Sequence, residues 1–483
     1  MASNWNCVLE KIRVRFAPSP TGWLHIGGLR TALYDYLFAR SLKGTCVLRI
    51  EDTDRSRYVE GAVENLIGSL RKLGLDYDEG PGLGGDYGPY TQSERLELYH
   101  REAQRLLESG HAYYCFCSQE TLEEMRANQQ ASKEFVKYDR RCLKLSRQEV
   151  ETKLAAGEKH VLRLRMPDER KFGFDDLIRG HVEMDASQSD DQVLLKSDGF
   201  PTYHLAAVVD DHYMRISHVI RGEEWLSSTP KHIWLYECLD WQAPQWVHLP
   251  LILNPDRSKL SKRMNDVSVE SYLQKGYLKE ALLNFIALLG WHPADDRELY
   301  SLAELCEIFS LERVNKAGAV FDLTKLDWMN GQYLRDLPLE TVVERSLPFF
   351  VEQNLPILEK ETLKRMVGAA RERCSLLSEI PSYCRMFISP NALEGEDLQS
   401  VRSDSAQLVL SWFSTQIPAA MPLNPEKVEE LVKRGIAETG LKGKAFYTPL
   451  RLALIGQAHG PDLPSTFAIL GDEEALKRIR SWL

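Results

Sequence analysis

The sequence predicts an α/β fold with a nucleotide-binding unit at its N-terminal end and an all-helical C-terminal region. Residues 12–54 read as a strand, a glycine-bearing turn, a helix and a second strand, which is the order of a nucleotide-binding α/β unit. From Tyr113 to about Met184 the pattern changes to that of an insert. Beyond Met329 apolar residues recur at helical spacing between proline and glycine breaks, as expected for consecutive helices.

Local patterns predict the elements of the first stretch in order. Alternating apolar residues predict a strand that begins at Ile12, and the prolines and glycine of residues 18–22 stop it. A leucine at every fourth position predicts the helix that follows, which ends at Gly44. Residues 46–50 then read as the second strand.

The same periodicities predict the later elements. The predicted helices are 58–73, 92–108, 273–289, 339–350, 360–377, 406–414, 425–438, 449–455 and 473–482. Strands are expected at 193–196 and 218–222, with an apolar run at 203–209 between them. Ser93 is the expected cap of the helix 92–108.

Length and composition indicate a multidomain protein of the aqueous phase. The 483 residues exceed what one core usually supports, so about two to four domains are expected. A net charge of −10 argues against non-specific binding to nucleic acid but leaves room for a local basic track. No apolar run reaches the roughly 18 residues of a membrane span, and residues 1–10 carry no hydrophobic leader, so we expect no membrane partner and a cytoplasmic location.

The first stretch places polar groups where open parallel sheets bind ligands, at the carboxyl ends of strands. Gly27 and Gly28 let backbone N–H groups approach a phosphate at a helix start, and His25 adds a side-chain donor. Arg15 suits a carboxylate and Glu51 an ammonium. The structural alternative is that Arg15 pairs with Glu51 and that His25 only caps the helix.

A second basic segment lies far downstream. Residues 259–263 (KLSKR) place three cations within five positions, after the turn-prone residues 254–256 (NPD). Such a loop can close over a triphosphate, although basic loops taken alone are more often simply solvated.

Together the two segments resemble the HIGH and KMSKS signatures of class I aminoacyl-tRNA synthetases. Five longer strings resemble the glutamyl branch, of the bacterial and organellar type: residues 15–22 (RFAPSPTG), 50–55 (IEDTDR), 201–205 (PTYHL), 208–211 (VVDD) and 219–225 (VIRGEEW). The resemblance implies a Rossmann-type class I catalytic domain with an acceptor-stem-binding insert, a stem-contact domain and an all-helical C-terminal anticodon-binding region. An all-helical tail argues against the glutaminyl branch, whose anticodon module is made of β-barrels.

The resemblance also implies a domain order. The expected segments are the two halves of the catalytic domain at 1–112 and 191–240, the insert at 113–190, the stem-contact domain with the KLSKR loop at 241–328, and two helical anticodon-binding subdomains at 329–400 and 401–483.

The resemblance implies the following site residues. The glutamate pocket would be lined by Arg15, Ala17, Ser19, Glu51, Tyr203 and Arg221. ATP would contact His25, Gly27, Gly28, Glu224, Trp225, Lys259, Leu260, Ser261 and Lys262, of which His25 and Lys262 are the expected catalytic groups, with Mg²⁺. The chain departs from relatives at Gly28, where the general HIGH motif ends in histidine, and at Ala207, where some relatives carry an asparagine whose role is not transferred here.

Three cysteines of the insert resemble a zinc site found in some relatives. Cys115 and Cys117 precede a charged helix, and Tyr138 and Cys142 follow it. Three thiolates with a tyrosine or a water complete a tetrahedral Zn²⁺ set. Three thiols without metal are the open alternative, because Cys-x-Cys is a less demanding pattern than paired Cys-x-x-Cys.

Contacts with tRNA are expected in two regions. Insert cations that could meet phosphates are Arg163, Arg165, Arg170, Lys171 and Arg179, each of which alone is more often just solvated. Positions that match anticodon contacts are Arg373, Arg451, Pro461 and Leu463. An arginine at 373 is the family's feature for restricting charging to glutamate tRNA; without the resemblance, Arg373 reads as a surface residue and Leu463 as core.

The implied reaction activates L-glutamate with ATP to glutamyl-adenylate and transfers it to the 3′ end of tRNA(Glu), with activation that depends on bound tRNA. A monomer is expected. The alternatives are a truncated tRNA-modifying glutamyl transferase, which lacks a helical tail, a non-catalytic tRNA-binding relative, which would lose His25 or the 259–263 loop, and another HxGH nucleotidyltransferase, which would lack the insert and tail.

Overall fold

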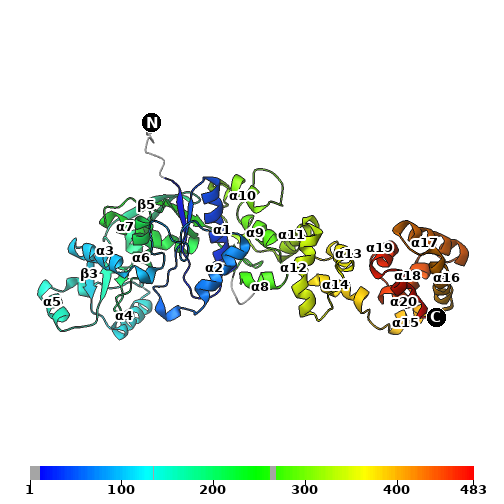
Figure 1. The fold of residues 1–483 in the computed structure, drawn as a ribbon. Helices are drawn as coiled ribbons and strands as arrows, with labels where there is room; N and C mark the ends of the chain where they lie inside the picture. The colour runs from blue at the N-terminus through cyan, green and yellow to red at the C-terminus, as the bar shows by residue number, and fades with distance from the viewer. Residues whose placement is uncertain (1–10, 134, 261–267) are drawn as a thin grey trace. The chain divides into compact units, whose positions relative to one another are not determined.

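The computed structural model describes residues 11–133, 135–260 and 268–483 (Figure 1). These residues divide into two units. The first holds the described residues up to Ser271 together with Leu283–Asp322, and the second holds Tyr272–Leu282 and Leu323–Leu483. Among the described residues, all strands lie in the first unit.

The core sheet of the first unit begins with β1 (Arg13–Phe16) and β2 (Thr45–Leu48), which pair in parallel. Strands β8 (His218–Gly222) and β9 (Gln245–Leu249) also pair in parallel. The Ser217 N–H donates to the Arg13 carbonyl oxygen at 2.9 Å, which holds the start of β8 beside β1. Helix α1 (Ile26–Ser41) connects β1 to β2, so the predicted strand, helix and strand are confirmed.

The other strands of this unit are β3 (Ala112–Cys115), β4 (Val161–Leu164), β5 (Lys171–Asp176), β6 (Gly180–Asp185), β7 (Val193–Leu195), β10 (Ile252–Leu253) and β11 (Ala319–Val320). Its other helices are α2 (Ala62–Leu73), α3 (Leu96–Glu108), α4 (Gln119–Ala131), α5 (Arg147–Ala155), α6 (Tyr203–Tyr213), α7 (Thr229–Cys238) and α10 (Leu302–Ile308). Helices α8 (Val269–Gln274) and α9 (Lys279–Ala287) contribute residues to both units.

Helix α1 is held at both ends by local chemistry. Nδ1 of His25 accepts a hydrogen bond from the Gly28 N–H at 3.0 Å and so caps the N-terminus. After the helix, a Cβ on Gly44 would lie 2.6 Å from the Ile12 carbonyl oxygen, so only glycine lets the chain return this close to β1.

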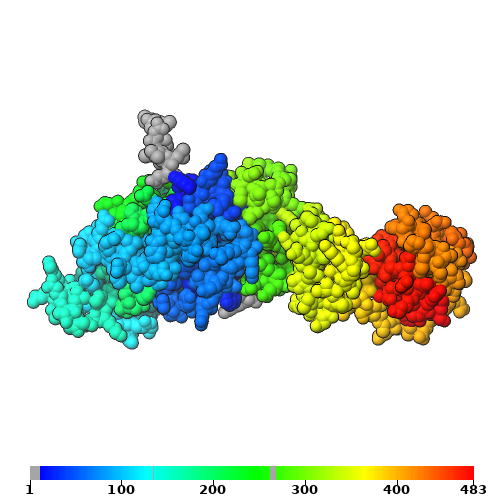
Figure 2. All heavy atoms as spheres, in the orientation of Figure 1, coloured from blue at the N-terminus to red at the C-terminus, as the bar shows by residue number. Residues whose placement is uncertain are grey.

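The insert forms a small sheet of its own in the order β3-β4-β7, with antiparallel pairing. Helices α4 and α5 flank it, and Figure 2 shows this part of the chain, in cyan, as a lobe that projects from the blue and green spheres of the same unit. Strands β5 and β6 form an antiparallel pair beside β9. The insert therefore has a framework that is separate from the β1–β2 pair.

The second unit is helical and has one apolar core. Its helices are α11 (Leu323–Asp336), α12 (Leu339–Glu352), α13 (Lys360–Arg371), α14 (Glu379–Ile388), α15 (Gly395–Val401), α16 (Asp404–Ala420), α17 (Pro425–Thr439), α18 (Lys444–Ile455), α19 (Leu463–Leu470) and α20 (Asp472–Arg480). The sequence patterns missed four helices of this unit, α11, α14, α15 and α19; the last three have ten residues or fewer, and the apolar residues at the start of α11 fall at mixed spacing.

Three local predictions were wrong. The apolar run 203–209 is part of helix α6. Ser93 caps no helix, because α3 begins at Leu96, and the Ser93 N–H donates instead to Asp52. The predicted helix 273–289 is broken near Gly276, whose φ of +94° cannot continue a helix.

Among the described helices, none is both long and apolar enough to cross a membrane. The eight cysteines of the described residues are all free thiols.

Candidate active site

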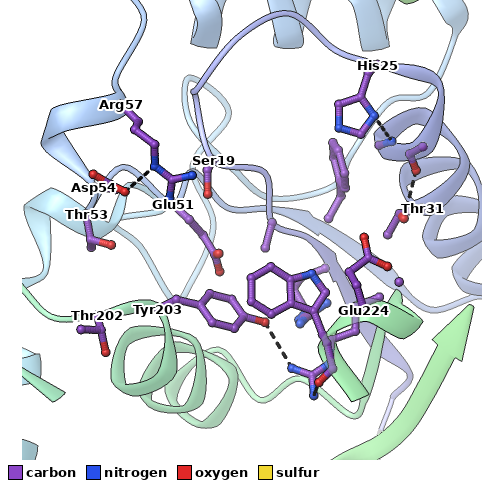
Figure 3. A pocket seen from close by; sticks show the side chains of 18 of the residues that line it. Ser19, His25, Thr31, Glu51, Thr53, Asp54, Arg57, Thr202, Tyr203 and Glu224 are labelled. Carbon is purple, nitrogen blue, oxygen red and sulfur yellow. Dashed lines mark hydrogen bonds and ion pairs between the residues drawn. The ribbon is translucent and has the colours of Figure 1, made fainter. Parts of the chain in front are cut away.

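A cavity of about 860 Å³ opens at the carboxyl ends of β1, β2 and β8 (Figure 3). All six predicted glutamate residues line it: Arg15, Ala17, Ser19, Glu51, Tyr203 and Arg221. So do seven of the nine predicted ATP residues: His25, Gly27, Gly28, Glu224, Trp225, Lys259 and Leu260. Ser261 and Lys262 lie outside the described residues. The fold thus brings together two segments more than 200 positions apart, His25 and Lys259.

The floor of the cavity is a buried network of ion pairs. Nε of Arg15 donates to Asp211 Oδ1 at 3.0 Å, and Nη1 of Arg49 donates to the same oxygen at 2.8 Å. Nη2 of Arg49 also donates to Glu51 at 3.1 Å. Burial by itself would raise the pKa of Asp211, but the two guanidinium groups outweigh it and hold that pKa below its ordinary value. Arg15 therefore pairs with Asp211, and Glu51 pairs with Arg49, which replaces the Arg15–Glu51 pair of the structural alternative.

Glu51, one of several carboxylates that line the cavity, lies between Ser19 and Tyr203 (Figure 3). Burial raises its pKa to about 7, although Arg49 and Arg15 act in the opposite direction. Near neutral pH the group is thus poised between its two forms, and a bound ammonium would favour the charged one.

The second guanidinium of the recess belongs to Arg221. Its Nη1 donates to the Tyr203 hydroxyl at 3.2 Å, the bond drawn from Tyr203 in Figure 3. The ring of Tyr203 packs against that of Trp225 with centroids 4.3 Å apart. Burial raises the pKa of Tyr203, so its phenol is neutral and can donate. Arg15, Arg221 and Tyr203 together offer donors suited to a carboxylate.

The nucleotide end of the cavity is built around His25. Because Nδ1 accepts from Gly28, the proton of a neutral ring is on Nε2, which makes that atom a donor. A Cβ on Gly27 would lie 3.2 Å from the imidazole, so a small residue is favoured beside it. His25 thus caps the helix, and the cap is compatible with a role at the phosphate, because capping uses only one ring nitrogen.

The base of the 259–263 loop reaches the other predicted ATP segment. Nζ of Lys259 lies 3.6 Å from Glu224 Oε1, and both side chains are about half exposed. Such a pair is weak, so an incoming polyphosphate can displace the carboxylate at little cost.

Sequence reasoning missed the residues that hold the floor together. Asp210 accepts hydrogen bonds from Gln92 at 2.9 Å, Arg95 at 2.7 Å and Tyr99 at 2.8 Å, and it is fully buried. Arg49 is fully buried as well. The sequence feature that could have identified them is a charged residue inside an apolar segment, because a charged side chain is buried only together with a partner.

The insert brings its predicted ligands together. The sulfur atoms of Cys115, Cys117 and Cys142 lie within 4.8 Å of one another, and the Tyr138 oxygen lies 3.3 Å from two of them. Cys117 Sγ and Cys142 Sγ are 3.6 Å apart, near the edge of about 3.8 Å that Zn–S bonds of 2.3 Å give in a tetrahedron. Hydrogen bonding between Cys115 and Cys142 lowers the pKa of Cys115 and raises that of Cys142, so the two sulfur atoms share a proton.

The predicted RNA contacts separate by exposure. Arg373 is exposed, and Arg451 is half-buried with its guanidinium 5.9 Å from the Tyr447 ring centroid. Pro461 and Leu463 are buried, and Leu463 belongs to the apolar core.

Most of the insert cations have partners within the protein, and their contact with phosphates stays a prediction. Arg163 is buried, Arg170 pairs with Glu237, Lys171 with Glu183 and Arg179 with Glu223, which leaves the exposed Arg165.

Comparison with known proteins covers both units. Residues 11–328 match the family described as tRNA synthetases class I (E and Q), catalytic domain, and residues 341–483 match an anticodon binding domain. The glutamate–tRNA ligase of Alkaliphilus metalliredigens is 47% identical, over 98% of this chain and 99% of the relative. That of Clostridioides difficile is 46% identical, over 97% and 98%.

Solved structures agree. The crystal structure of a glutamate tRNA ligase from Elizabethkingia meningosepticum in complex with its amino acid superposes with a TM-score of 0.91 at 38% identity, over 98% of this chain and 99% of that one. The enzyme of Elizabethkingia anophelis gives 0.90 at 37% identity. These matches confirm the predicted fold class, and their full length excludes the truncated transferase. The cavity contains the predicted residues, and both parts of the chain match the family over their length. The chain therefore belongs to the glutamate–tRNA ligase family of class I tRNA synthetases.

Proposed function

We propose that this chain ligates L-glutamate to tRNA(Glu) in two steps, and that the cavity of Figure 3 is where both occur. The observation that carries the proposal is a charge pattern. The guanidinium groups of Arg15 and Arg221 and the carboxylate of Glu51, which are all buried, line the same cavity as the His25–Gly28 turn, together with other charged side chains such as Arg30, Asp54 and Glu224. Glutamate has the complementary pattern of two carboxylates and one ammonium, and the turn suits a phosphate.

The first step needs no protein nucleophile. The α-carboxylate of glutamate attacks the α-phosphate of ATP, which gives glutamyl-adenylate and diphosphate. The protein contributes position and charge stabilisation: the amides at Gly27 and Gly28 and the His25 side chain at the phosphates, and Lys259 and Lys262 from the loop. Mg²⁺ would supply charge neutralisation at the phosphates.

In the second step the terminal ribose hydroxyl of the tRNA takes the glutamyl group and AMP leaves. The helical unit is the proposed reader of the anticodon, with Arg373 and Arg451 as the accessible cations among the predicted contacts. Leu463 and Pro461 are buried, which favours a role in packing beneath this surface. Direct contact of their side chains with the anticodon is less favoured.

For the insert we propose a structural Zn²⁺ held by Cys115, Cys117, Cys142 and Tyr138. The distances between the four side chains support it. The metal would supply a cross-link between the β3 end and the segment after α4 in a lobe with a small core.

The test of the function is charging with purified components. Radiolabelled glutamate, ATP and tRNA(Glu) should give glutamyl-tRNA, and glutamine in place of glutamate should give none. ATP–diphosphate exchange should appear only when tRNA(Glu) is present. Absence of charging with every glutamate-accepting tRNA would overturn the proposal, whereas exchange without tRNA would overturn only the tRNA dependence.

A further inference from the structure

All five N–H donors of the Arg221 guanidinium have a partner within the protein. The partners are His248 Nε2 at 3.0 Å, His232 Nδ1 at 3.1 Å, the Tyr203 hydroxyl at 3.2 Å, Thr229 Oγ1 at 2.9 Å and the Trp225 carbonyl oxygen at 3.4 Å. Two of them, Tyr203 and Trp225, line the cavity. The other three are buried and are not among the lining residues, so they hold the guanidinium from behind.

The tautomer of His248 is set by its second partner. Its Nδ1 lies 2.7 Å from Asp176 Oδ2, and both side chains are fully buried. Because the carboxylate can only accept, Nδ1 carries the proton and Nε2 is left as the acceptor for Arg221. Burial lowers the pKa of His248 below its ordinary value, so the ring is neutral.

His232 is an acceptor by the same logic. Its Nδ1 accepts from Arg221, so the proton is on Nε2, which lies 3.0 Å from Nδ1 of His204. Burial and the neighbouring Arg221 lower the pKa of His232 well below its ordinary value, and burial lowers that of His204 to about 3. Both rings are therefore neutral at any physiological pH.

Neutral partners leave the charge of Arg221 available. Arg15 and Arg49 share the carboxylate of Asp211, which offsets their charge. Arg221 forms no such ion pair with any described residue, because an imidazole stands between it and Asp176. A guanidinium fixed by neutral acceptors keeps its full attraction for a bound anion and loses little entropy on binding it.

We propose that His248 and His232 are positioning residues for Arg221: they fix its guanidinium without neutralising it, so that a carboxylate of glutamate can replace the Trp225 carbonyl oxygen, the longest of the five contacts at 3.4 Å, and also accept from the Tyr203 hydroxyl. Tyr203 accepts from Arg221 and keeps its own proton to donate to the same carboxylate. This inference rests on the proposed function, since it requires glutamate in the cavity.

The test is a pair of substitutions at one position. His248→Met keeps bulk and removes the acceptor, whereas His248→Gln retains an acceptor near the place of Nε2. The Met variant should raise the KM for glutamate about 10- to 100-fold, as expected for loss of a hydrogen bond to a charged group, with the KM values for ATP and tRNA changed by less than about twofold. The Gln variant should restore most of the glutamate KM.

Two results would overturn the proposal: an unchanged glutamate KM in His248→Met, or an equal rise of all three KM values that Gln does not rescue, which marks a structural role. If the wild-type protein charges tRNA(Glu) in the same assay, the proposed function holds, and either result then counts against the positioning role alone. His232→Met with His232→Asn repeats the test at the second imidazole. If neither Met variant folds, NMR spectra of wild-type protein with ¹⁵N-labelled histidine are the test. The proposal requires that both rings are neutral at pH 7 and that their ¹⁵N signals shift when glutamate is added.

Discussion

Individual buried carboxyl groups determine how the cavity and its surroundings respond to pH. Glu51, Asp211 and Asp35 are all buried in the same part of the first unit, yet their environments push their pKa values in different directions. Two arginines lower the pKa of Asp211, whereas burial prevails at Glu51 and Asp35. Each difference is measurable as a pH dependence.

Glutamate affinity should depend on the ionisation of Glu51. Because the pKa of Glu51 is raised to about 7 and the substrate ammonium favours the charged carboxylate, binding releases a proton below that pH. The Kd for glutamate should fall about tenfold per pH unit up to pH 7 and level off above it. Isothermal titration at pH 5.5 to 8 measures this. Glu51→Gln should bind weakly without this slope, and a flat wild-type profile would contradict the assignment.

Asp35→Asn should stabilise the protein at neutral and higher pH. Asp35 lies within α1, is fully buried, and neither of its carboxylate oxygens has a hydrogen-bond partner among the residues that the structure describes. Burial raises its pKa well above the ordinary 3.8. A raised folded-state pKa means that this group's contribution is fully present below pH 3.8 and is lost as pH rises towards the folded-state value, at about 1.4 kcal/mol per pH unit.

The stability gain of the Asn variant should therefore increase with pH. Denaturant unfolding at pH 5, 6, 7 and 8 measures the difference from wild type. Asp240→Asn is the matched control, because that side chain is 94% exposed and its φ of 52° also suits asparagine. A difference that is constant across this range would show that Asp35 is charged in the folded protein.

Helices and strands position these charged side chains at strand ends and helix starts, beside the cavity. Helix α6 does two jobs: its first residue, Tyr203, lines the cavity, and its last turns hold Asp210 and Asp211 under the arginines.

Lys262→Ala should lower the rate of glutamate activation about 100-fold or more, since removing one preorganised charge from a transition state costs this much. Steady-state ATP–diphosphate exchange with tRNA(Glu) measures it. Lys72→Ala, on the exposed face of α2, is the control for loss of one positive charge. Equal rates in the two variants would remove Lys262 from the mechanism.

Freshly purified protein should contain about one Zn²⁺ per chain, and Cys117→Ser should lose it. Metal analysis by mass spectrometry tests this, with Cys238→Ser, a thiol outside the cluster, as control. Wild-type protein that is free of zinc would leave the three thiols as unmetallated packing residues.

At the scale of the whole molecule, a catalytic unit and a helical unit lie on one chain and are matched together in relatives. This arrangement lets an anticodon be read by residues that take no part in the chemistry. Exposed cations of the helical unit should thus change which tRNA is charged and leave activation chemistry alone.

Arg373→Gln should relax discrimination between tRNA(Glu) and tRNA(Gln), by roughly 10-fold if the guanidinium contributes one charge-assisted contact. Charging of both purified tRNAs with radiolabelled glutamate gives the ratio of kcat/KM. Arg402→Gln, also exposed in the helical unit, is the control. Wild type that charges both tRNAs equally well would contradict the role of Arg373.

Much of the site was predictable because its information is local. The HIGG turn, the strand ends and the KLSKR loop are short strings whose residue types already specify phosphate and carboxylate chemistry. The misread elements have local reasons too: the run 203–209 is apolar on all sides because α6 is buried, so its periodicity gives no sign of a helix.

The sequence by itself determined the family, the α/β core followed by helices, and the glutamate residues and most of the ATP residues that meet in the cavity, because period and motif are properties of neighbouring positions. Only the tertiary structure decided which charges pair. Arg15 pairs with Asp211, which is 196 positions away in the sequence, and Arg221 donates a hydrogen bond to His248, which is 27 positions away. Whether a buried group is neutralised, left charged or forced to hold its proton depends on such distant partners and on burial, and neither is encoded in a local pattern.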